Sequence, residues 1–421
     1  MKLKKIISTN LRAGALTYTL FVAILSSIIL SAIILTGYYH KVEYSHYKLE
    51  KQNLANMSSA IAKALAVDDL SYTEVYREPI FTDGYDSMEI ISSPWGAWDI
   101  LKVRTFNNHG SYSKYFTKGY FRSGKAQSAL YVYDEGRPVS VSGKTKITGK
   151  AYLPKAGLRS SYVGRIGYGN NKLIYGEKLD SEDKMPSVNS KRTKVLKQFA
   201  SGSYQQLFDP EMVLTDKEIT SNSFTTDLLV HHRYDDVHLR DSLQGFIWIH
   251  ANKRIFLDSE AYLDHVILSA PIIEVDSGFT GAVQLFATDT ILIGSGAKLT
   301  YPSFIGLVNE EPPATINLEP NVEVNGVIYM NGDEDWFNQR ILVISDQATV
   351  KGMVYCHGMA EMTGTINGHL TTRKFLINTF SGVYENYIFN AKLNGTELGS
   401  EFATSDLWFY ADHKNVLEWL D

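Results

Sequence analysis

The stretch from Ala13 to His40 contains no Asp, Glu, Lys or Arg, and this feature constrains the fold most. Because a helix rises about 1.5 Å per residue, about 20 apolar residues cross the ~30 Å hydrocarbon core of a bilayer. The stretch ends on Tyr38, Tyr39 and His40, side chains that suit a membrane interface. We therefore predict a transmembrane helix over residues 13–40, rather than a cleaved signal peptide, whose apolar core is usually about 7–15 residues.

The flanking charges predict the orientation of this helix. Lys2, Lys4, Lys5 and Arg12 lie in the short N-terminal segment, and short basic segments stay on the cytoplasmic side of a membrane. We expect residues 1–12 to form a cytoplasmic leader. The body then lies in the periplasm or outside the cell as part of a single-pass protein of a bacterial inner membrane, with the lipid bilayer as a partner.

Residues 41–69 are predicted to extend the helix as an amphipathic segment. No Pro or Gly occurs from Lys41 to Ala66, and apolar residues recur at spacings of three, four or seven. These residues are Tyr47, Leu54, Met57, Ile61 and Leu65.

The basic leader, the glycine at its end (Gly14) and the long helix resemble the N-terminal region of type IV pilins and pseudopilins. In that family a prepilin peptidase cuts after the glycine, and the fifth residue of the mature chain is usually Glu. The corresponding residue here is Thr19. The resemblance implies cleavage after Gly14 and packing of the helix against other envelope or pilus-like proteins.

The composition favours a large body that is mainly β. The 421 residues are 44% hydrophobic with a formal charge of −5, which suits two or three domains and indicates no nucleic-acid partner. The 26 Tyr and 19 Phe residues favour strands. Cys356 is the only cysteine, so no intramolecular disulfide forms, and we expect this side chain to be buried in a strand.

Residues 70–136 have the pattern of short strands separated by polar turns, which predicts a small membrane-proximal β module. Trp95 and Trp98 flank a short turn within it. Two tryptophans in this arrangement can form a platform for a sugar, but a small core or a turn is the interpretation we prefer.

A repeat of the form [V/I]-x-G-x-[apolar]-Tyr predicts the architecture of the rest. It occurs at Ile147–Tyr152, Val324–Tyr329 and Val350–Tyr355, with a less regular copy at Met362–Asn367. Short strands with an inward apolar residue at every second position, a glycine at a bend and a recurring unit are typical of a β-solenoid. The residues that define the repeat are Gly149, Tyr152, Gly326, Tyr329, Gly352, Tyr355 and Gly364.

The spacing of these copies is irregular, which favours a right-handed solenoid with loops of varied length. We predict first solenoid strands over 137–180, a charged insertion over 181–221 with helical stretches near 194–200 and 215–219, and the main solenoid over 222–400. Residues 401–421 are predicted to form a C-terminal cap, as a strand followed by a short amphipathic helix. A β-sandwich is the alternative, because it also produces short strands at regular spacing.

The phrases VNGVIYMNG and VKGMVYCHGMAEMTGTINGHL resemble bactofilins and the β-helical bodies of some pilin-like membrane proteins. The resemblance to bactofilins implies polymerisation end to end through uncapped coils, without a nucleotide. A cap over residues 401–421 would oppose such stacking.

Candidate chemistry is sparse. His231, Asp235 and His238 offer imidazole and carboxylate ligands for a transition metal, although a polar connection into the solenoid explains the same residues. Polysaccharide-cleaving β-helix enzymes carry clustered carboxylates on one face, and five acidic residues lie close enough in sequence to be considered. They are Asp258, Glu260, Asp264, Asp276 and Asp289.

The sequence therefore predicts a membrane-anchored structural or scaffold protein of the cell envelope, non-catalytic and without a cofactor. Two alternatives stay open. One is an enzyme or binding module that acts on surface polysaccharide, and the other is a bactofilin-like polymer.

Overall fold

The structure is a computed structural model, and it shows a mainly β protein with 52% of its residues in strands and a long N-terminal helix. Contacts divide the chain into two compact units. The first contains the chain up to Ile61, Glu78–Met88 and Arg104–Tyr112, and the second contains Ala62–Arg77, Glu89–Val103 and the chain from Ser113 onward. The residues described are 13–67, 70–72, 74–80, 86–107, 110–203, 220–309, 313–380, 382–399, 402–408 and 414–420.

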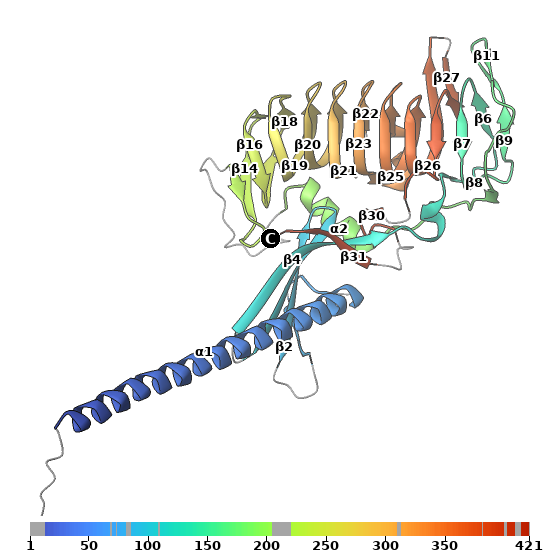
Figure 1. Cartoon of the computed structure of the whole chain (residues 1–421). Helices are drawn as coiled ribbons and strands as arrows, with labels where there is room; N and C mark the ends of the chain where they lie inside the picture. Colours follow the sequence, from blue (N-terminus) through green and yellow to red (C-terminus); the bar gives the residue numbers. More distant parts are fainter. Residues whose placement is uncertain are drawn as a thin grey trace, which may run out of the picture. The chain divides into compact units, whose positions relative to one another are not determined.

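Helix α1 runs without interruption from Ala13 to Ala66 and is drawn in blue in Figure 1. It is long and apolar enough to cross a membrane, with a mean hydropathy of 2.5 in its most apolar part. Large side chains in that part are exposed on all sides, as shown by Leu16 at 78%, Ile29 at 52% and Ile34 at 65%. A helix that is apolar around its whole circumference is stable in lipid rather than in water.

The buried face in the second half of α1 differs from the predicted one. Met57 is buried as expected, but Leu54 is 52% exposed, and the other fully buried positions include Asn56 and Ala60. Small and amide side chains let the helix approach its neighbours closely, which the apolar pattern alone does not show. Within the first unit, Asp86 accepts hydrogen bonds from Gln52 Nε2 at 2.9 Å and from Asn107 Nδ2 at 2.8 Å.

An antiparallel sheet follows the helix in the chain. Its order is β1–β2–β3–β4–β30, and β31 also pairs with β4. The two C-terminal strands pair antiparallel with β4, through contacts such as Ala403 with Phe121 and Val416 with Lys118. The bounds are β1 Tyr76–Pro79, β2 Ser87–Trp95, β3 Trp98–Asn107, β4 Gly110–Phe121, β30 Ala403–Thr404 and β31 Lys414–Trp419.

This pairing corrects the predicted cap. Residues 414–419 form a strand instead of an amphipathic helix, because β4 offers them an edge that the sequence around Val416 cannot reveal. They also lie on the antiparallel sheet and not over the last coil of the parallel strands.

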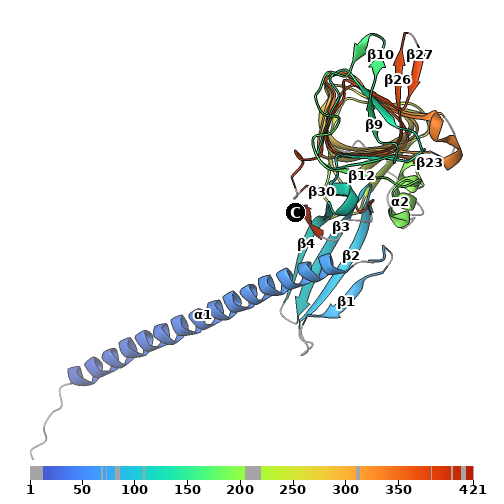
Figure 2. The same cartoon turned by 90° about the vertical axis from the view of Figure 1, so that its right-hand side faces the viewer.

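The other large element is a closed network of strands, which is parallel except for the β26–β27 pair and appears as a row of arrows in Figure 1. Partners on successive turns of the chain lie 15 to 27 residues apart, as in the pairs Ala360–Phe375 and Thr365–Lys392. Figure 2 looks along this row and shows the strands surrounding a common interior. Parallel pairing to the next turn of the chain differs from the antiparallel pairing of a β-sandwich.

The strands of this network and those beside it have the following bounds. They are β5 Leu130–Val132, β6 Val139–Ser142, β7 Lys146–Thr148, β8 Ala151–Leu153, β9 Leu158–Ser160, β10 Tyr162–Val163, β11 Ile166–Gly167, β12 Lys178–Asp180, β13 Ser221–Asn222, β14 Leu229–Arg233, β15 Val237–Leu239, β16 Ser242–Gly245, β17 Ile247–Ala251, β18 Arg254–Leu257, β19 Tyr262–Val275, β20 Thr280–Ile293, β21 Lys298–Asn309, β22 Ala314–Leu318, β23 Glu323–Gly332, β24 Arg340–Ile344, β25 Thr349–Met362, β26 Thr365–Thr379, β27 Gly382–Glu385, β28 Tyr387–Phe389 and β29 Lys392–Asn394.

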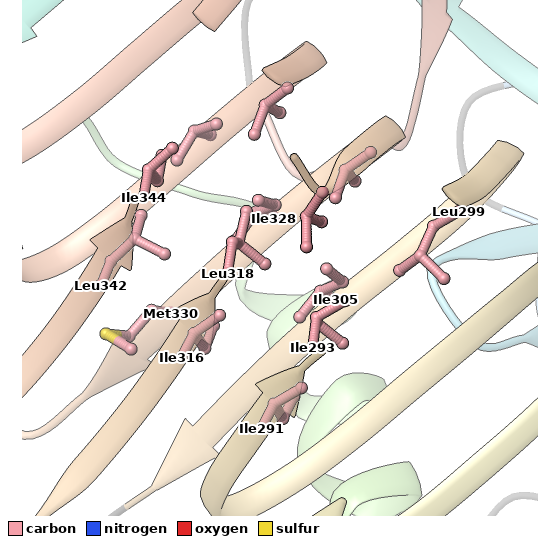
Figure 3. Close-up of a cluster of buried hydrophobic side chains, with 14 of the residues drawn as sticks. Ile291, Ile293, Leu299, Ile305, Ile316, Leu318, Ile328, Met330, Leu342 and Ile344 are labelled. Atoms are coloured by element: carbon pink, nitrogen blue, oxygen red, sulfur yellow. The ribbon is translucent and has the colours of Figure 1, made fainter. Parts of the chain in front are cut away.

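The core of the parallel network is a column of aliphatic side chains in register from strand to strand. Leu285, Ile305, Ile328, Val354 and Leu370 are paired in sequence and all are completely buried. Figure 3 shows neighbouring members of this core pointing into the same interior. Each strand therefore buries its inner side chains only when the adjacent turns of the chain are present.

The strands of residues 130–180 occupy an unexpected place in the network. They continue it beyond its C-terminal turns, because Leu370 pairs with Leu130 and Lys392 pairs with Lys146. We predicted instead that residues 137–180 begin the row, and we assigned residues 130–136, which contain β5, to the membrane-proximal module. In Figure 1, β7, β8 and β9 accordingly lie next to β26 and β27.

Helix α2 (Ser190–Ala200) lies in the predicted insertion. It begins after Asn189, whose side chain accepts hydrogen bonds from the backbone N–H groups of Lys191 and Arg192 at 3.0 and 3.4 Å. The helix contacts β19, β20 and β21 from outside the network. The second helical stretch, predicted near 215–219, lies outside the described residues.

Candidate functional site

Two of the repeat tyrosines, Tyr329 and Tyr355, point away from the inner core and are buried beneath the insertion. Tyr329 and Tyr355 are in register, and their rings stack with centroids 5.5 Å apart at 26°. The Tyr329 hydroxyl lies 3.2 Å from Thr193 Oγ1 on α2, and the Tyr355 hydroxyl donates to the Pro186 carbonyl oxygen at 3.3 Å. Burial raises the pKa of Tyr329 to about 12. These two tyrosines therefore hold the insertion on the strands.

Tyr131 and Tyr152 continue the same column. They pair across β5 and β8, with ring centroids 5.8 Å apart. The Tyr131 hydroxyl donates to the Lys184 carbonyl oxygen at 3.1 Å. Tyr131, which lies outside the repeat motif, therefore also holds the insertion, and the half-buried repeat tyrosine Tyr152 packs against its ring.

The repeat glycines are required because neighbouring turns approach closely. Gly326, Gly352 and Gly368 are in register with φ of +154°, +152° and +153°. A Cβ at Gly352 would fall on the Gly326 carbonyl oxygen. Gly149 has φ +108° and follows the same column. The predicted Gly364 instead lies in the turn between β25 and β26, so Gly368 is the repeat glycine of that copy.

A buried ion cluster joins three distant segments. The guanidinium of Arg192, only 1% exposed, contacts Asp99 Oδ1 at 2.7 Å and Asp406 Oδ1 at 2.5 Å. Arg192 also donates to the Trp98 carbonyl oxygen at 3.1 Å, and Tyr72 donates to Asp99 at 2.8 Å. Burial opposes the Arg192 charge, but the two carboxylates outweigh burial and raise the pKa of Arg192 well above its ordinary value.

Trp95 and Trp98 are part of a buried hydrophobic core, as the preferred interpretation predicted. Both are buried, with ring centroids 6.0 Å apart. Gln284 of β20 accepts a hydrogen bond from the Ala97 N–H at 2.9 Å and donates to the Trp95 carbonyl oxygen at 3.1 Å. The turn between the tryptophans therefore docks on the parallel strands.

His265 links β19 to the C-terminal strand. An irregularity in β19 places it at φ +62°, and its two ring nitrogens lie 2.6 Å from Asp264 Oδ1 and 2.8 Å from Glu418 Oε2. The ring stacks on Trp95 with centroids 5.8 Å apart. Burial by itself would lower the pKa of His265, but the hydrogen bond and charge of Glu418, together with Asp264, outweigh burial and raise it.

This arrangement predicts a pH-dependent contribution to stability. Because the folded pKa of His265 lies above the unfolded value of about 6.5, the contribution is complete below about pH 6.5 and is lost as pH rises through the folded pKa. We expect His265→Gln to flatten the decline of unfolding free energy on the alkaline side, measured by urea unfolding at a series of pH values. Identical slopes in both proteins would contradict the prediction.

The contribution of His369 to stability changes with pH in the opposite direction from that of His265, and it does so in a lower pH range. It is buried between the Ser128 carbonyl oxygen and Thr371 Oγ1, at 2.8 and 2.6 Å, and burial lowers its pKa to about 4. Its contribution is lost as pH falls from about 6.5 toward about 4. The acid limb of the curve should therefore be unchanged in His265→Gln.

The candidate metal ligands are not brought together. His231 is buried in β14, Asp235 pairs with Lys253 Nζ at 2.8 Å, and His238 stacks on Phe256 with ring centroids 4.5 Å apart. Within the part of the chain that the structure describes, no group of three or more His, Cys, Asp or Glu side chains is placed to hold a metal ion.

The acidic residues considered for catalysis have structural partners. A cavity of about 330 Å³ is lined by Asp258 and Asp276, together with Glu274 and Glu319. Asp258 pairs with Arg240 at 3.2 Å, and Asp276 accepts from the Ser277 N–H at 2.7 Å.

Similar contacts occupy the other carboxylates. Glu274 pairs with Arg254 at 3.2 Å, Asp264 contacts His265, and Asp289 accepts from Thr290 Oγ1 at 2.5 Å. Glu260 donates its backbone N–H to Asp258 in a turn. Turn formation and ion pairing account for Asp258, Asp264, Asp276 and Asp289, whereas Glu260 takes part through its backbone N–H.

A larger cavity of about 840 Å³ lies between the outer face of the parallel strands and the strands β4 and β31. Its floor carries Tyr301, Asn325 and Lys351 from three successive turns. A break in register between Leu299 and Ser303 pushes Tyr301 outward, and its hydroxyl donates to the Ala403 carbonyl oxygen at 2.9 Å.

The opposite wall of this cavity is mostly aromatic or apolar. It contains Phe121, Phe402 and Asn415, and the Phe402 ring packs on Tyr301 with centroids 5.4 Å apart. Sequence reasoning did not find this site, because its residues come from separate strands and share no local motif.

Cys356 is completely buried, as predicted, and burial raises its pKa to about 12. A thiol in this state is protonated and inert at neutral pH.

Comparisons with protein-family models, curated proteins and solved structures find no match to this chain.

Proposed function

We propose that this chain is a membrane-anchored structural or scaffold protein of a bacterial envelope. Its N-terminus lies in the cytoplasm, and its β body lies in the periplasm or outside the cell. The body is a right-handed β-solenoid that presents a long side surface to partner proteins. The observation that carries the proposal is the combination of a helix whose N-terminal half is apolar and exposed with parallel strands stacked turn upon turn.

Helix α1 supports the proposal that the chain is held in a membrane. Apolar side chains cover every face of α1 from Leu16 to Leu35, and no described part of the chain covers that stretch. Lipid or other apolar helices are the surroundings that stabilise such a surface. The resemblance to type IV pilins favours like helices as partners.

The parallel strands support the proposed structural role. Its repeat residues have packing roles, since the glycines allow close approach of adjacent turns and the tyrosines hold the insertion. The irregular separation of paired strands, from 15 residues at Ala360–Phe375 to 27 at Thr365–Lys392, favours a right-handed solenoid with varied loops.

Cysteine labelling tests the orientation. Asp346 lies exposed in the turn before β25, and the natural Cys356 is buried, so a maleimide reports only the new thiol in Asp346→Cys. We expect a membrane-impermeant maleimide to label Asp346→Cys in spheroplasts, with the wild type as the unlabelled control. Labelling only after lysis would overturn the proposed orientation.

N-terminal sequencing of the chain from native membranes tests the pilin-like part. Ala15 as the first residue would support processing after Gly14 and assembly with like helices. An intact Met1 would reject processing and leave a plain anchor.

A further inference from the structure

We propose that the cavity beside Tyr301 binds an acidic sugar, a pyranose unit that carries a carboxylate. Its volume of about 840 Å³ lies within the range of about 300–1,000 Å³ that is usual for small-ligand sites. The proposal concerns a binding activity in addition to the scaffold role, and it stands on the chemistry of the cavity lining.

Aromatic side chains supply the apolar part of the site. Tyr301 lies on the floor, and Phe402 and Phe121 lie on the wall. The Tyr301 hydroxyl is held by the Ala403 carbonyl, so its ring is fixed in orientation. A pyranose ring has C–H groups on its faces, and rigid aromatic rings provide matching contact area.

Amide groups supply the polar part. Asn325 is half-buried on the floor, and Asn415 lies on the wall. Each amide has both donors and an acceptor, which is the combination that sugar hydroxyls require because they also donate and accept. Asn415 Oδ1 accepts a hydrogen bond from the Val416 N–H at 2.8 Å, so this side chain offers its amide hydrogens as donors at the cavity wall.

Lys351 decides the charge of the ligand. It extends from β25 between the two neighbouring turns and makes no ion pair with any residue that the structure describes. The described residues that line the cavity include no Asp or Glu. An ammonium group in such surroundings favours an anion, and a carboxylate on the sugar ring satisfies it.

An acidic peptide fits the lining less well. Peptides commonly bind by adding a strand to a free sheet edge, but β23 and β25 have hydrogen-bonded partners on both sides in β21 and β26. The floor therefore offers side chains and no free strand edge.

Calorimetry on the full-length chain in detergent tests the proposal, with tetragalacturonate as the acidic sugar, cellotetraose as the neutral sugar and tetraglutamate as the acidic peptide. We expect Lys351→Met to weaken tetragalacturonate binding by at least about tenfold, since it removes a charge-assisted hydrogen bond. Lys392→Met is the matched control, because Lys392 is exposed on β29 away from the cavity. It should change binding by less than about twofold.

Saturation-transfer NMR gives the second readout. Phe402→Leu keeps the apolar volume but removes the ring, and it should weaken transfer to the sugar ring protons while the fold is retained. Absence of tetragalacturonate binding, equal binding of cellotetraose or tetraglutamate, or equal losses in the two lysine variants would each overturn the proposal.

Discussion

Replacing Ile328 with Asp should unfold the parallel strands while α1 stays inserted in the membrane. Ile328 is completely buried between Ile305 and Val354, its partners on either side. An unpaired carboxylate there costs several kcal/mol, which is comparable to a total stability of about 5–15 kcal/mol. Circular dichroism in detergent should show loss of the cooperative β transition, and membrane fractionation should be unchanged.

Ile166→Asp is the matched control for this experiment. Ile166 is also a strand isoleucine, but it is 53% exposed in β11. It should unfold like the wild type. A retained transition in Ile328→Asp would show that this side chain does not point into a shared core.

Arg192→Met should lower the unfolding free energy by about 3–5 kcal/mol, because it leaves Asp99 and Asp406 buried without their counter-charge. The change should also release α2 from the strands and make residues 190–200 more sensitive to protease. Urea unfolding measures the first effect and limited proteolysis the second.

Two further variants separate charge from packing. Lys194→Met changes an exposed lysine on the same helix and should alter stability by less than about 0.5 kcal/mol. The triple variant Arg192→Met, Asp99→Asn and Asp406→Asn removes the uncompensated charges and should recover part of the loss. A loss below about 1 kcal/mol in Arg192→Met would contradict a dominant role for the cluster.

The parts of this fold that follow local patterns were predictable. The apolar run from Ala13 indicated the helix, and alternation within each repeat placed Ile328 and Val354 in the core. The repeat also identified Gly326 and Gly352, whose conformation a residue with a side chain rarely adopts.

Pairing between distant segments was not predictable. The sequence near Gly364 fits the repeat by spacing, yet the residue that pairs with the repeat glycine Gly352 is Gly368. Residues 414–419 form a strand only because β4 is their neighbour. The Arg192 cluster joins residues 93 and 214 positions apart in the chain, and the Tyr301 cavity likewise combines segments from Phe121 to Leu417. Such contacts depend on tertiary packing, which overrides local propensity.

The place of residues 130–180 in the network has a consequence for biogenesis. Leu130 finds its partner at Leu370, and Lys146 finds its partner at Lys392. The segments synthesised soon after α1 therefore lack these hydrogen-bonding partners until most of the polypeptide has been made. Late pairing of this kind slows assembly and leaves strand edges exposed during synthesis, so holding factors would protect the nascent chain.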